Sequence, residues 1–565
     1  MRMKRKTMTV VSVACVLLLS FLVGCTTGND GKIDNSSNNI KKLSEADAKT
    51  ELNSYVKKIG PSTATPKRDI DSGSVDTKAE LPDIDKTYPL TVEGSNQINA
   101  EIFVSPEKAG SGKDGLFNEM AEAFNKKNVT IDGKTVSVSI RSMASGTGLD
   151  YISSESYVPD AYTPSNQLWG KMLETQGTGL TTVAERTIGN TGGLLMKEAT
   201  YDDIVEKYGE VTVDSLVKAV MDDDMLLGYT NPYTSSTGLS LLTQLMTHFD
   251  SENPLSDQAV DALRNFQKDL PSTLYNTLQL REVAKNGSVD ILSISYQTYI
   301  NTPEFKQYKY VPLGMRQDSP MYVMNDAAKE KQQVVSAFTE FVEEQANQEK
   351  ASSYGFNQLD DYDYQLEAID GATITSIQKL WKENKNGGKP IIAVFVADVS
   401  GSMDGAPINS LKQSLLNSGK YIGDDAYVGL VSYSDQVTIE LPIERMDSKQ
   451  RSYFTGAIKN LTADGGTATY DGTLVALSMI QEKLEEVPDA RPIIFVLSDG
   501  ETNEGYEFNK VAPIIKSLGV SVNTIGYNAQ LDELKKLSAI NESATINADN
   551  DDVVYQLKQL FNAEL

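Results

Sequence analysis

Cysteine and histidine are nearly absent from this chain of 565 residues, which has two cysteines and one histidine. The cysteines, Cys15 and Cys25, both lie close to the N-terminus and are too few for a disulfide framework. A zinc site would need several His or Cys ligands, so none is expected. Catalysis by a Ser-His-Asp or Cys-His group would need His248, which has no nucleophile motif near it. We interpret His248 as a partly buried residue of a helix.

Positive charge is also scarce, with 52 Lys and Arg against 78 Asp and Glu and a net charge of −26. Nucleic acids and anionic lipid head groups both require a basic surface, so we expect no nucleic-acid partner and no direct binding to the bilayer surface. Carboxylates are abundant, but no pair stands in a recognisable catalytic context. The chain is therefore predicted not to be an enzyme. Its length allows two to four domains of roughly 150 residues.

The N-terminus has the pattern of an export signal. Residues 1–6 are basic, and the apolar stretch of residues 10–23 is short for a membrane span of ~20 residues. The stretch ends in Leu22-Val23-Gly24-Cys25, which resembles the lipobox of bacterial lipoproteins. The resemblance implies a signal peptide over 1–24, lipidation of Cys25, and a position on the extracytoplasmic face of the bacterial cell membrane. An ordinary secretory signal with a chance cysteine remains the alternative.

Residues 25–95 are predicted to be a flexible tether with one short helix. Small polar residues fill 26–40, which cannot form a core. A helix is expected over 44–59, with Ser44 and Asp47 as a capping pair. Four prolines among charged residues predict an extended linker over 60–95.

Strand and helix patterns alternate over 389–565, which predicts a doubly wound, mostly parallel α/β sheet. The apolar run at 390–397 is typical of a strand buried on both faces. In such a sheet, ligands bind at the carboxyl ends of the strands. Further strands are expected at 427–432, 493–497, 520–527 and 544–546, and helices at 407–419, 447–460, 473–485, 507–518, 531–539 and 552–563.

Three polar motifs follow strands or precede a helix in this region: Asp398-Val399-Ser400-Gly401-Ser402, Asp464-Gly465-Gly466-Thr467 and Ser498-Asp499-Gly500. Together they resemble the von Willebrand factor A family, whose fold is Rossmann-like. The resemblance implies a metal-ion-dependent adhesion site, and every position of the family motif is filled here. Its ligands would be Asp398, Ser400, Ser402, Thr467 and Asp499.

Carboxylates and hydroxyls are hard oxygen ligands, so a divalent cation is the expected cofactor: Mg²⁺ first, with Mn²⁺ and Ca²⁺ as alternatives. This ligand set leaves a coordination position that an Asp or Glu carboxylate of a protein or matrix partner can fill. Two alternatives remain, a domain that folds without metal and an ion that only stabilises the loops.

Residues 96–360 are expected to form a second α/β unit, joined to the first by a linker over 361–388. Strands at 98–104, 136–140 and 291–295 and a helix at 116–124 are predicted, and glycine-containing Ser/Thr segments open further helices at 145 and 235. The set resembles bacterial extracellular solute-binding proteins, which implies two α/β lobes with the chain crossing between them twice.

A solute cleft is the functional expectation for this unit. Its candidate lining is Ser145, Ser235, Ser236, Thr237 and Tyr296. Helix N-termini favour anions, so a small oxyanion or a carboxylated solute would fit, although Ser and Thr also serve as plain helix caps. The leading hypothesis is a cell-surface lipoprotein that binds a partner through a divalent metal. The alternative is the solute-binding receptor of a membrane importer with an accessory docking domain.

Overall fold

The computed structural model describes residues 40–69 and 81–564, with gaps at 269, 271–273, 275–279, 281–282, 285–288, 363, 365–368, 420–421, 501, 528–530, 542 and 548–552. The predicted signal peptide over 1–24 and Cys25 lie outside the described residues. Within the described part of the chain, no helix combines the length and apolar character needed to cross a bilayer.

The C-terminal domain is built on a seven-stranded sheet in the order β1-β15-β14-β13-β16-β17-β18. The five strands from β14 to β18 in this order run parallel, and β15 is antiparallel to β14. Each residue of β13 is buried, as expected for a central strand covered on both faces. The bounds are β13 Ile391–Asp398, β14 Tyr427–Tyr433, β15 Val437–Arg445, β16 Arg491–Ser498, β17 Ser521–Gly526 and β18 Thr545–Asn547.

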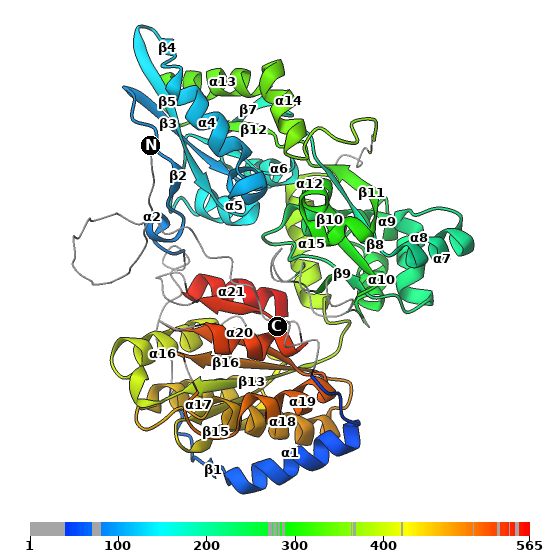
Figure 1. Cartoon of the computed structure of the whole chain (residues 1–565), viewed down its shortest axis with the longest axis vertical. Helices are drawn as coiled ribbons and strands as arrows, with labels where there is room; N and C mark the ends of the chain where they lie inside the picture. Colours follow the sequence, from blue (N-terminus) through cyan, green and yellow to red (C-terminus); the bar gives the residue numbers. More distant parts are fainter. Residues whose placement is uncertain are drawn as a thin grey trace, which may run out of the picture. The chain divides into compact units, whose positions relative to one another are not determined.

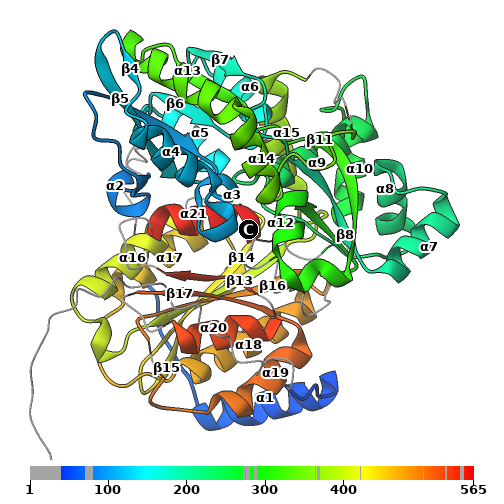
Figure 2. The same ribbon diagram turned by 45° about the horizontal axis from the view of Figure 1, so that its top comes forward.

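Helices cover both faces of this sheet, which confirms the predicted doubly wound fold. Alternate residues of β13 belong to two separate apolar clusters, one on each face. Figures 1 and 2 show α16 and α21 on one side of the sheet and α18 and α19 on the other. The helices are α16 Ala406–Ser418, α17 Ser448–Asn460, α18 Thr469–Glu486, α19 Phe508–Leu518, α20 Asp532–Ser538 and α21 Val553–Glu564.

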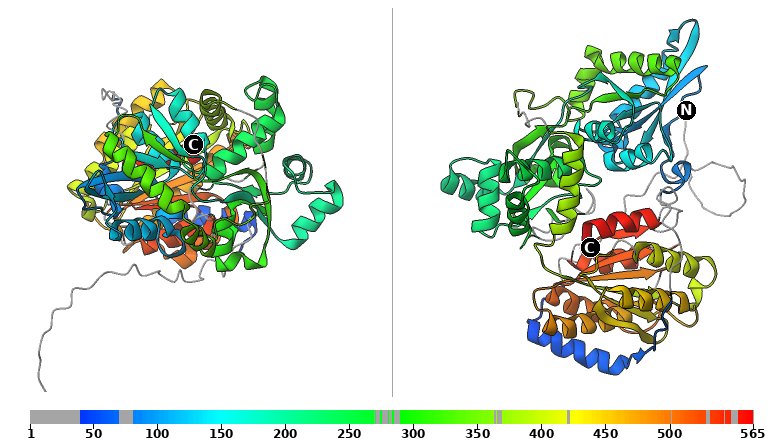
Figure 3. Two further views of the ribbon diagram at one scale, coloured as in Figure 1. Left: turned by 90° about the horizontal axis from the view of Figure 1, so that it is seen from above. Right: turned by 180° about the vertical axis from the view of Figure 1, so that it is seen from behind.

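The segment before residue 70 is part of the C-terminal domain, whereas the sequence predicted a tether there. Helix α1 (Glu45–Ile59) forms as expected, and the Ser44 hydroxyl accepts a hydrogen bond from the Asp47 N–H. The helix packs against α18 and α19, and its Leu52 lies in the core of that domain. Strand β1 (Ser62–Thr63) pairs in parallel with β15 at the edge of the sheet. Figure 3 shows α1 alongside the same helices from behind. The apolar face of α1 explains the difference, because it requires a partner.

The chain between β1 and β13 forms two α/β lobes, as predicted. The first lobe has a sheet in the order β2-β5-β3-β6-β12-β7, with β4 (Thr130–Ile131) paired to β5. Its other strands are β2 Leu90–Val92, β3 Ile98–Val104, β5 Lys134–Ser142, β6 Ala161–Thr163, β7 Leu180–Ala184 and β12 Met321–Met324. Its helices are α2 Ile84–Thr87, α3 Pro106–Ala109, α4 Leu116–Lys126, α5 Ser145–Ser153, α6 Leu168–Thr175, α13 Lys329–Glu343 and α14 Gln345–Ser353.

The second lobe has a four-stranded sheet in the order β11-β8-β10-β9. The chain enters it between β7 and β8 and leaves it between β11 and β12, so the predicted double crossing is confirmed. The strands are β8 Thr191–Met196, β9 Leu227–Gly228, β10 Ile291–Ser295 and β11 Lys309–Arg316, and the helices are α7 Glu198–Tyr208, α8 Val213–Asp222, α9 Ser236–Phe249, α10 Asp257–Gln267 and α12 Tyr296–Asn301.

The region expected to be a linker, 361–388, instead contains helix α15 (Gly371–Asn384). This helix packs against α6 of the first lobe and against α9 and α10 of the second. Its buried side chains include Ile374, Ile377 and Trp381, and the Trp381 indole N–H donates to the Tyr229 hydroxyl at 2.7 Å. The helical spacing of these apolar residues is the reason that the segment folds onto the lobes.

We predict that Leu52→Ala lowers the opening free energy of the C-terminal sheet by about 2–5 kcal/mol, because it leaves a cavity under α1. Hydrogen exchange of peptides from β13 and β16 in the full chain measures this energy. Asn53→Ala, on the exposed side of the same helix, is the control. Equal exchange in both variants would show that α1 contributes nothing to the domain.

Candidate functional site

The predicted metal motifs meet at the carboxyl end of the central strands. β13 ends at Asp398 and β16 ends at Ser498, and these two strands are parallel neighbours. β14, which follows β13 along the chain, lies on the other side of β13. The chain therefore continues to opposite sides after β13 and after β16, and this edge of the sheet is where ligands of doubly wound folds bind.

Asp398 forms the buried floor of the site, with no exposed surface. One carboxylate oxygen accepts from the Ser400 N–H at 2.8 Å, and the other accepts from the hydroxyls of Ser498 at 2.6 Å and Tyr433 at 3.3 Å. Burial raises the pKa of Asp398; the hydrogen bonds from Ser400 and Ser498 oppose this shift, and the negative charge of Asp499 adds to it.

A line of oxygens leads from this floor to the surface. The Ser400 and Ser402 hydroxyls are 3.0 Å apart, and the Ser402 hydroxyl donates to the Asp499 carboxylate at 3.0 Å. Ser400 is buried, Asp499 is partly buried and Ser402 is exposed. Four of the five predicted ligands are thus connected, and the connection reaches solvent at Ser402.

The loop that carries the fifth predicted ligand is attached directly to the first motif. The Gly401 N–H donates to the Gly465 carbonyl at 3.0 Å, and the Asp464 N–H donates to the Val399 carbonyl at 2.8 Å. Gly465 has a φ of +85°, which a residue with a Cβ adopts only with strain. The two backbone contacts hold the loops together without using any of the predicted ligand oxygens.

Thr467, the fifth predicted ligand, is buried and is held by the loop after β16. The Asn503 side-chain oxygen accepts from the Thr467 N–H at 2.9 Å, and the Asn503 N–H donates to the Thr467 carbonyl at 3.0 Å. Farther along the same loop, Tyr506 donates its N–H to Asp471 at 2.8 Å and stacks on Tyr55 of α1, with ring centroids 4.5 Å apart. The N-terminal helix therefore supports this loop.

Three residues outside the predicted ligand set support the site, namely Ser498, Tyr433 and Asn503. Ser498 and Tyr433 are polar residues at the ends of buried strands, a position that could have indicated their role. Asn503 carries no such signal, because its contact depends on two loops that meet only in the fold.

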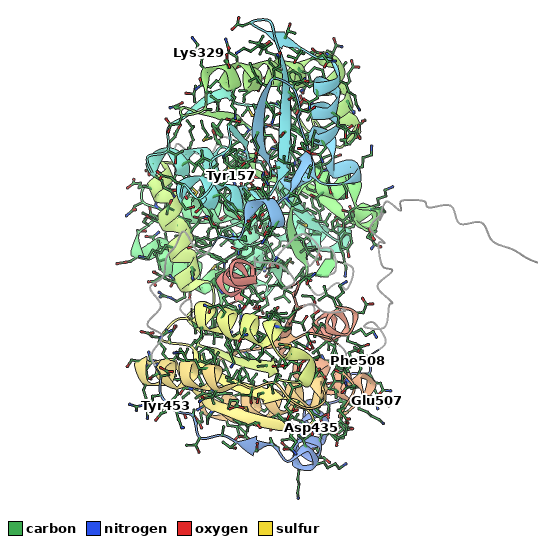
Figure 4. All side chains as sticks on the ribbon, turned by 90° about the vertical axis from the view of Figure 1, so that its left-hand side faces the viewer. Tyr157, Lys329, Asp435, Tyr453, Glu507 and Phe508 are labelled. Carbon is green, nitrogen blue, oxygen red and sulfur yellow. The ribbon has the colours of Figure 1, made fainter. Side chains whose placement is uncertain are left out.

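Figure 4 shows Asp435, in the turn after β14, on the same side of the domain as Glu507, which precedes α19.

The chemistry of these groups fits a hard divalent cation. In the described part of the chain, no Lys or Arg side chain forms an ion pair with Asp398 or Asp499. A buried carboxylate without a basic partner is costly, and a cation would compensate its charge. The described residues contain no group of three or more His, Cys, Asp and Glu side chains suited to a metal, so a cation here would depend on the hydroxyls as well as on the two carboxylates.

The predicted cleft residues do not all contact one another. The Ser236 hydroxyl donates to the Ser145 hydroxyl at 3.2 Å, so these two residues from different lobes meet. Ser235 is a helix cap, because its hydroxyl accepts from the Gly238 N–H at 3.3 Å. Thr237 accepts from Gln317 at 3.1 Å. Tyr296 packs with Tyr299 and Tyr310, with ring centroids 5.8 and 5.2 Å away.

Two protein families match separate parts of the chain. Residues 393–563 match the von Willebrand factor type A domain, and residues 109–357 match the bacterial extracellular solute-binding proteins. The chain therefore contains a domain of each kind, in the order expected from the sequence. Both are domains of a binding kind rather than an enzymatic kind.

Curated relatives match only one part of this chain. An uncharacterized protein, sll0103, of Synechocystis sp. is 27% identical over 177 residues, which are 30% of this chain and 41% of that protein. The inter-alpha-trypsin inhibitor heavy chain H3 of Mus musculus is 30% identical over 128 residues, 21% of this chain and 14% of its own length. The chain thus spans less than half the length of these relatives.

Solved structures are similar to one part or the other. Iron-bound HitA from Pseudomonas aeruginosa covers 52% of this chain and 99% of its own, with 14% identity and a TM-score of 0.37. A von Willebrand factor type A protein from Catenulispora acidiphila covers 31% of this chain and 42% of its own, with 20% identity and a TM-score of 0.28.

We predict that Ser498→Ala lowers the opening free energy of β13 by about 1–3 kcal/mol, because the buried Asp398 carboxylate loses its shortest hydrogen bond. Hydrogen exchange in EDTA measures the change in the absence of metal. Ser410→Ala, on the exposed side of α16, is the matched control. An unchanged exchange rate at β13 would mean that Asp398 does not depend on Ser498.

Proposed function

We propose that this protein binds a divalent cation, Mg²⁺ first, through Asp398, Ser400, Ser402, Thr467 and Asp499, and uses the ion to bind an acidic group of a protein or matrix partner. The observation that carries the proposal is the buried Asp398 carboxylate, which has hydroxyl neighbours but no basic partner among the described residues. The match of residues 393–563 to the von Willebrand factor type A domain supports it.

The five residues would contact the ion from different sides. Asp398 would hold the ion from the buried side, and Asp499 and the three hydroxyls would complete its protein ligands. Because Ser402 is exposed, the ion would face solvent on that side. The two carboxylates match the divalent charge of the ion, and the other three ligands are neutral hydroxyls. The ion therefore still presents a positive field on its open side, which would attract an Asp or Glu of the partner.

Isothermal titration with MgCl₂ tests the metal site. We expect Asp398→Ala to weaken Mg²⁺ binding by roughly 100-fold or more, since a direct ligand outweighs the supporting contacts whose loss typically costs 10–100-fold. Asp489→Ala is the control, because this exposed carboxylate precedes β16 at the opposite edge of the sheet. If the unaltered protein takes up no Mg²⁺, Mn²⁺ or Ca²⁺, the proposed site is refuted.

A pull-down from cell envelope and matrix material tests the partner. We expect capture that requires Mg²⁺, is reversed by EDTA and is lost in Asp398→Ala while Asp489→Ala retains it. Capture that persists in both variants and in EDTA would assign partner binding to another surface.

We also propose that the protein is anchored by lipid at Cys25 on the extracytoplasmic face of the cell membrane. The sequence Leu22-Val23-Gly24-Cys25 and the match to extracellular solute-binding proteins support this location. We expect Cys25→Ser to release the protein from the membrane fraction and to abolish the mass of a diacylglycerol on the mature N-terminus. A variant that stays in the membrane fraction would contradict the anchor.

The solute-receptor function remains the second candidate, and the two-lobed fold over 109–357 is the observation that favours it. In that case Asp398→Ala would leave solute uptake unchanged. Uptake that falls together with Mg²⁺ binding would instead tie both domains to one function.

A further inference from the structure

A chain of hydrogen bonds joins the two lobes at the predicted cleft. The Trp169 indole N–H, from the first lobe, donates to the Ser236 hydroxyl of the second lobe at 2.8 Å. The Ser236 hydroxyl donates to Ser145 at 3.2 Å, and the Ser145 hydroxyl lies 3.5 Å from that of Ser165. Ser145, Ser165 and Ser236 are all buried. The hydroxyls at the meeting point are therefore already occupied with one another.

The chain ends on the carboxylate of Glu107. The Ser165 hydroxyl donates to one Glu107 oxygen at 2.8 Å, and the Ser105 hydroxyl donates to the same oxygen at 2.5 Å. An ionised carboxylate only accepts hydrogen bonds, so the Ser105 and Ser165 hydroxyls both donate to it. The Ser165 N–H also donates to the Ser145 hydroxyl at 3.3 Å, which joins this end of the chain to the residue that meets Ser236.

The buried Lys108 provides the opposite charge beside Glu107. Its ammonium group donates to the Thr163 carbonyl at 2.9 Å, the Thr163 hydroxyl at 3.2 Å and the Pro164 carbonyl at 3.1 Å. These three contacts use all its donors and fix the segment that carries Ser165. Burial lowers the pKa of Lys108 to about 8, which leaves the side chain charged at neutral pH. Its ammonium group is therefore committed to these three oxygens, and the charge of Glu107 opposes the lowering of its pKa.

Direct contacts between the lobes leave little space at this point. The Gly146 N–H donates to the Thr234 carbonyl at 3.2 Å, and a Cβ on Gly146 would lie 1.9 Å from the Tyr233 carbonyl oxygen. The Asn166 side chain also donates to the Ser236 carbonyl at 3.2 Å. Helix α15 adds an apolar connection, because its Ile374 shares a core with residues of both lobes.

We infer that the carboxylate of Glu107 takes the place of a free anion in the serine cluster of the first lobe that meets Ser236, and so keeps the two lobes closed without a solute. A small oxyanion at this position would meet the charge of Glu107 and would find the hydroxyls already donating toward it. The domain therefore acts as a closed, self-liganded unit that excludes sulfate, phosphate and acetate. This inference is independent of the metal site, and it removes anion delivery from the receptor alternative.

Hydrogen exchange on the full chain tests the inference through peptides that cover α5 and the start of α9. We expect Glu107→Ala to speed exchange there about tenfold or more, because two charge-assisted hydrogen bonds are lost. Acetate should restore the original rate, since it replaces the missing methylene carboxylate, and neutral acetamide should not. Glu122→Ala, on the exposed side of α4, should exchange like the unaltered protein.

The unaltered protein supplies a second measurement that requires no variant. We expect no heat and no added protection of α5 or α9 when sulfate, phosphate or acetate is titrated into it. Binding of any of these anions at this position would overturn the inference. An exchange rate in Glu107→Ala equal to that of Glu122→Ala, or one indifferent to acetate, would do the same. If the alanine variant does not fold, Glu107→Gln replaces it in the test. This variant keeps the shape of the side chain, and its exchange rate should lie between those of the unaltered protein and of a variant without the carboxylate.

Discussion

A carboxylate without exposed surface ends the central strand of the C-terminal domain, and much of the surrounding structure compensates its charge. Desolvation of Asp398 is unfavourable unless donors surround it, and the donors come from Ser400, Ser498 and Tyr433. Each of these residues lies at or just beyond the end of a parallel strand, so the sheet order that places β13 between β14 and β16 also satisfies the carboxylate. Both the fold and the proposed cation site thus depend on compensating the charge of the buried Asp398 carboxylate.

The regular part of this domain could be predicted from the sequence because its strands are buried on both faces and read as continuous apolar runs. β13, β14, β16, β17 and β18 formed close to the expected residues. β15 was missed, since a strand that alternates apolar with polar or charged residues and contains Pro442 resembles a loop; it lies next to the edge strand β1. The five candidate ligands could be named from motifs, whereas Asn503 could not, because its contact joins two loops distant in sequence.

The middle domain shows the same limit more strongly. Its lobes and crossings followed from the resemblance to solute-binding proteins, and Ser145 and Ser236 could be chosen as residues of helix starts. The carboxylate that receives their hydrogen bonds could not be chosen, because Glu107 reaches the cluster through Ser165, which is 58 residues away along the chain. Residue type and spacing predict which groups can bind an anion, but only the fold determines whether a side chain already fills that position.

The position of α1 in the fold constrains the order in which the protein can fold. Its neighbour Leu43 donates an N–H to the Ser517 hydroxyl, across 474 residues of chain. Since the N-terminal end of a chain is synthesised first, the apolar side of α1 has no surface to cover it until α18 and α19 have been made. Helix α1 is made early and packs against helices made much later. Closing so long a loop adds little entropy cost but slows folding. During that interval the apolar side of α1 remains exposed.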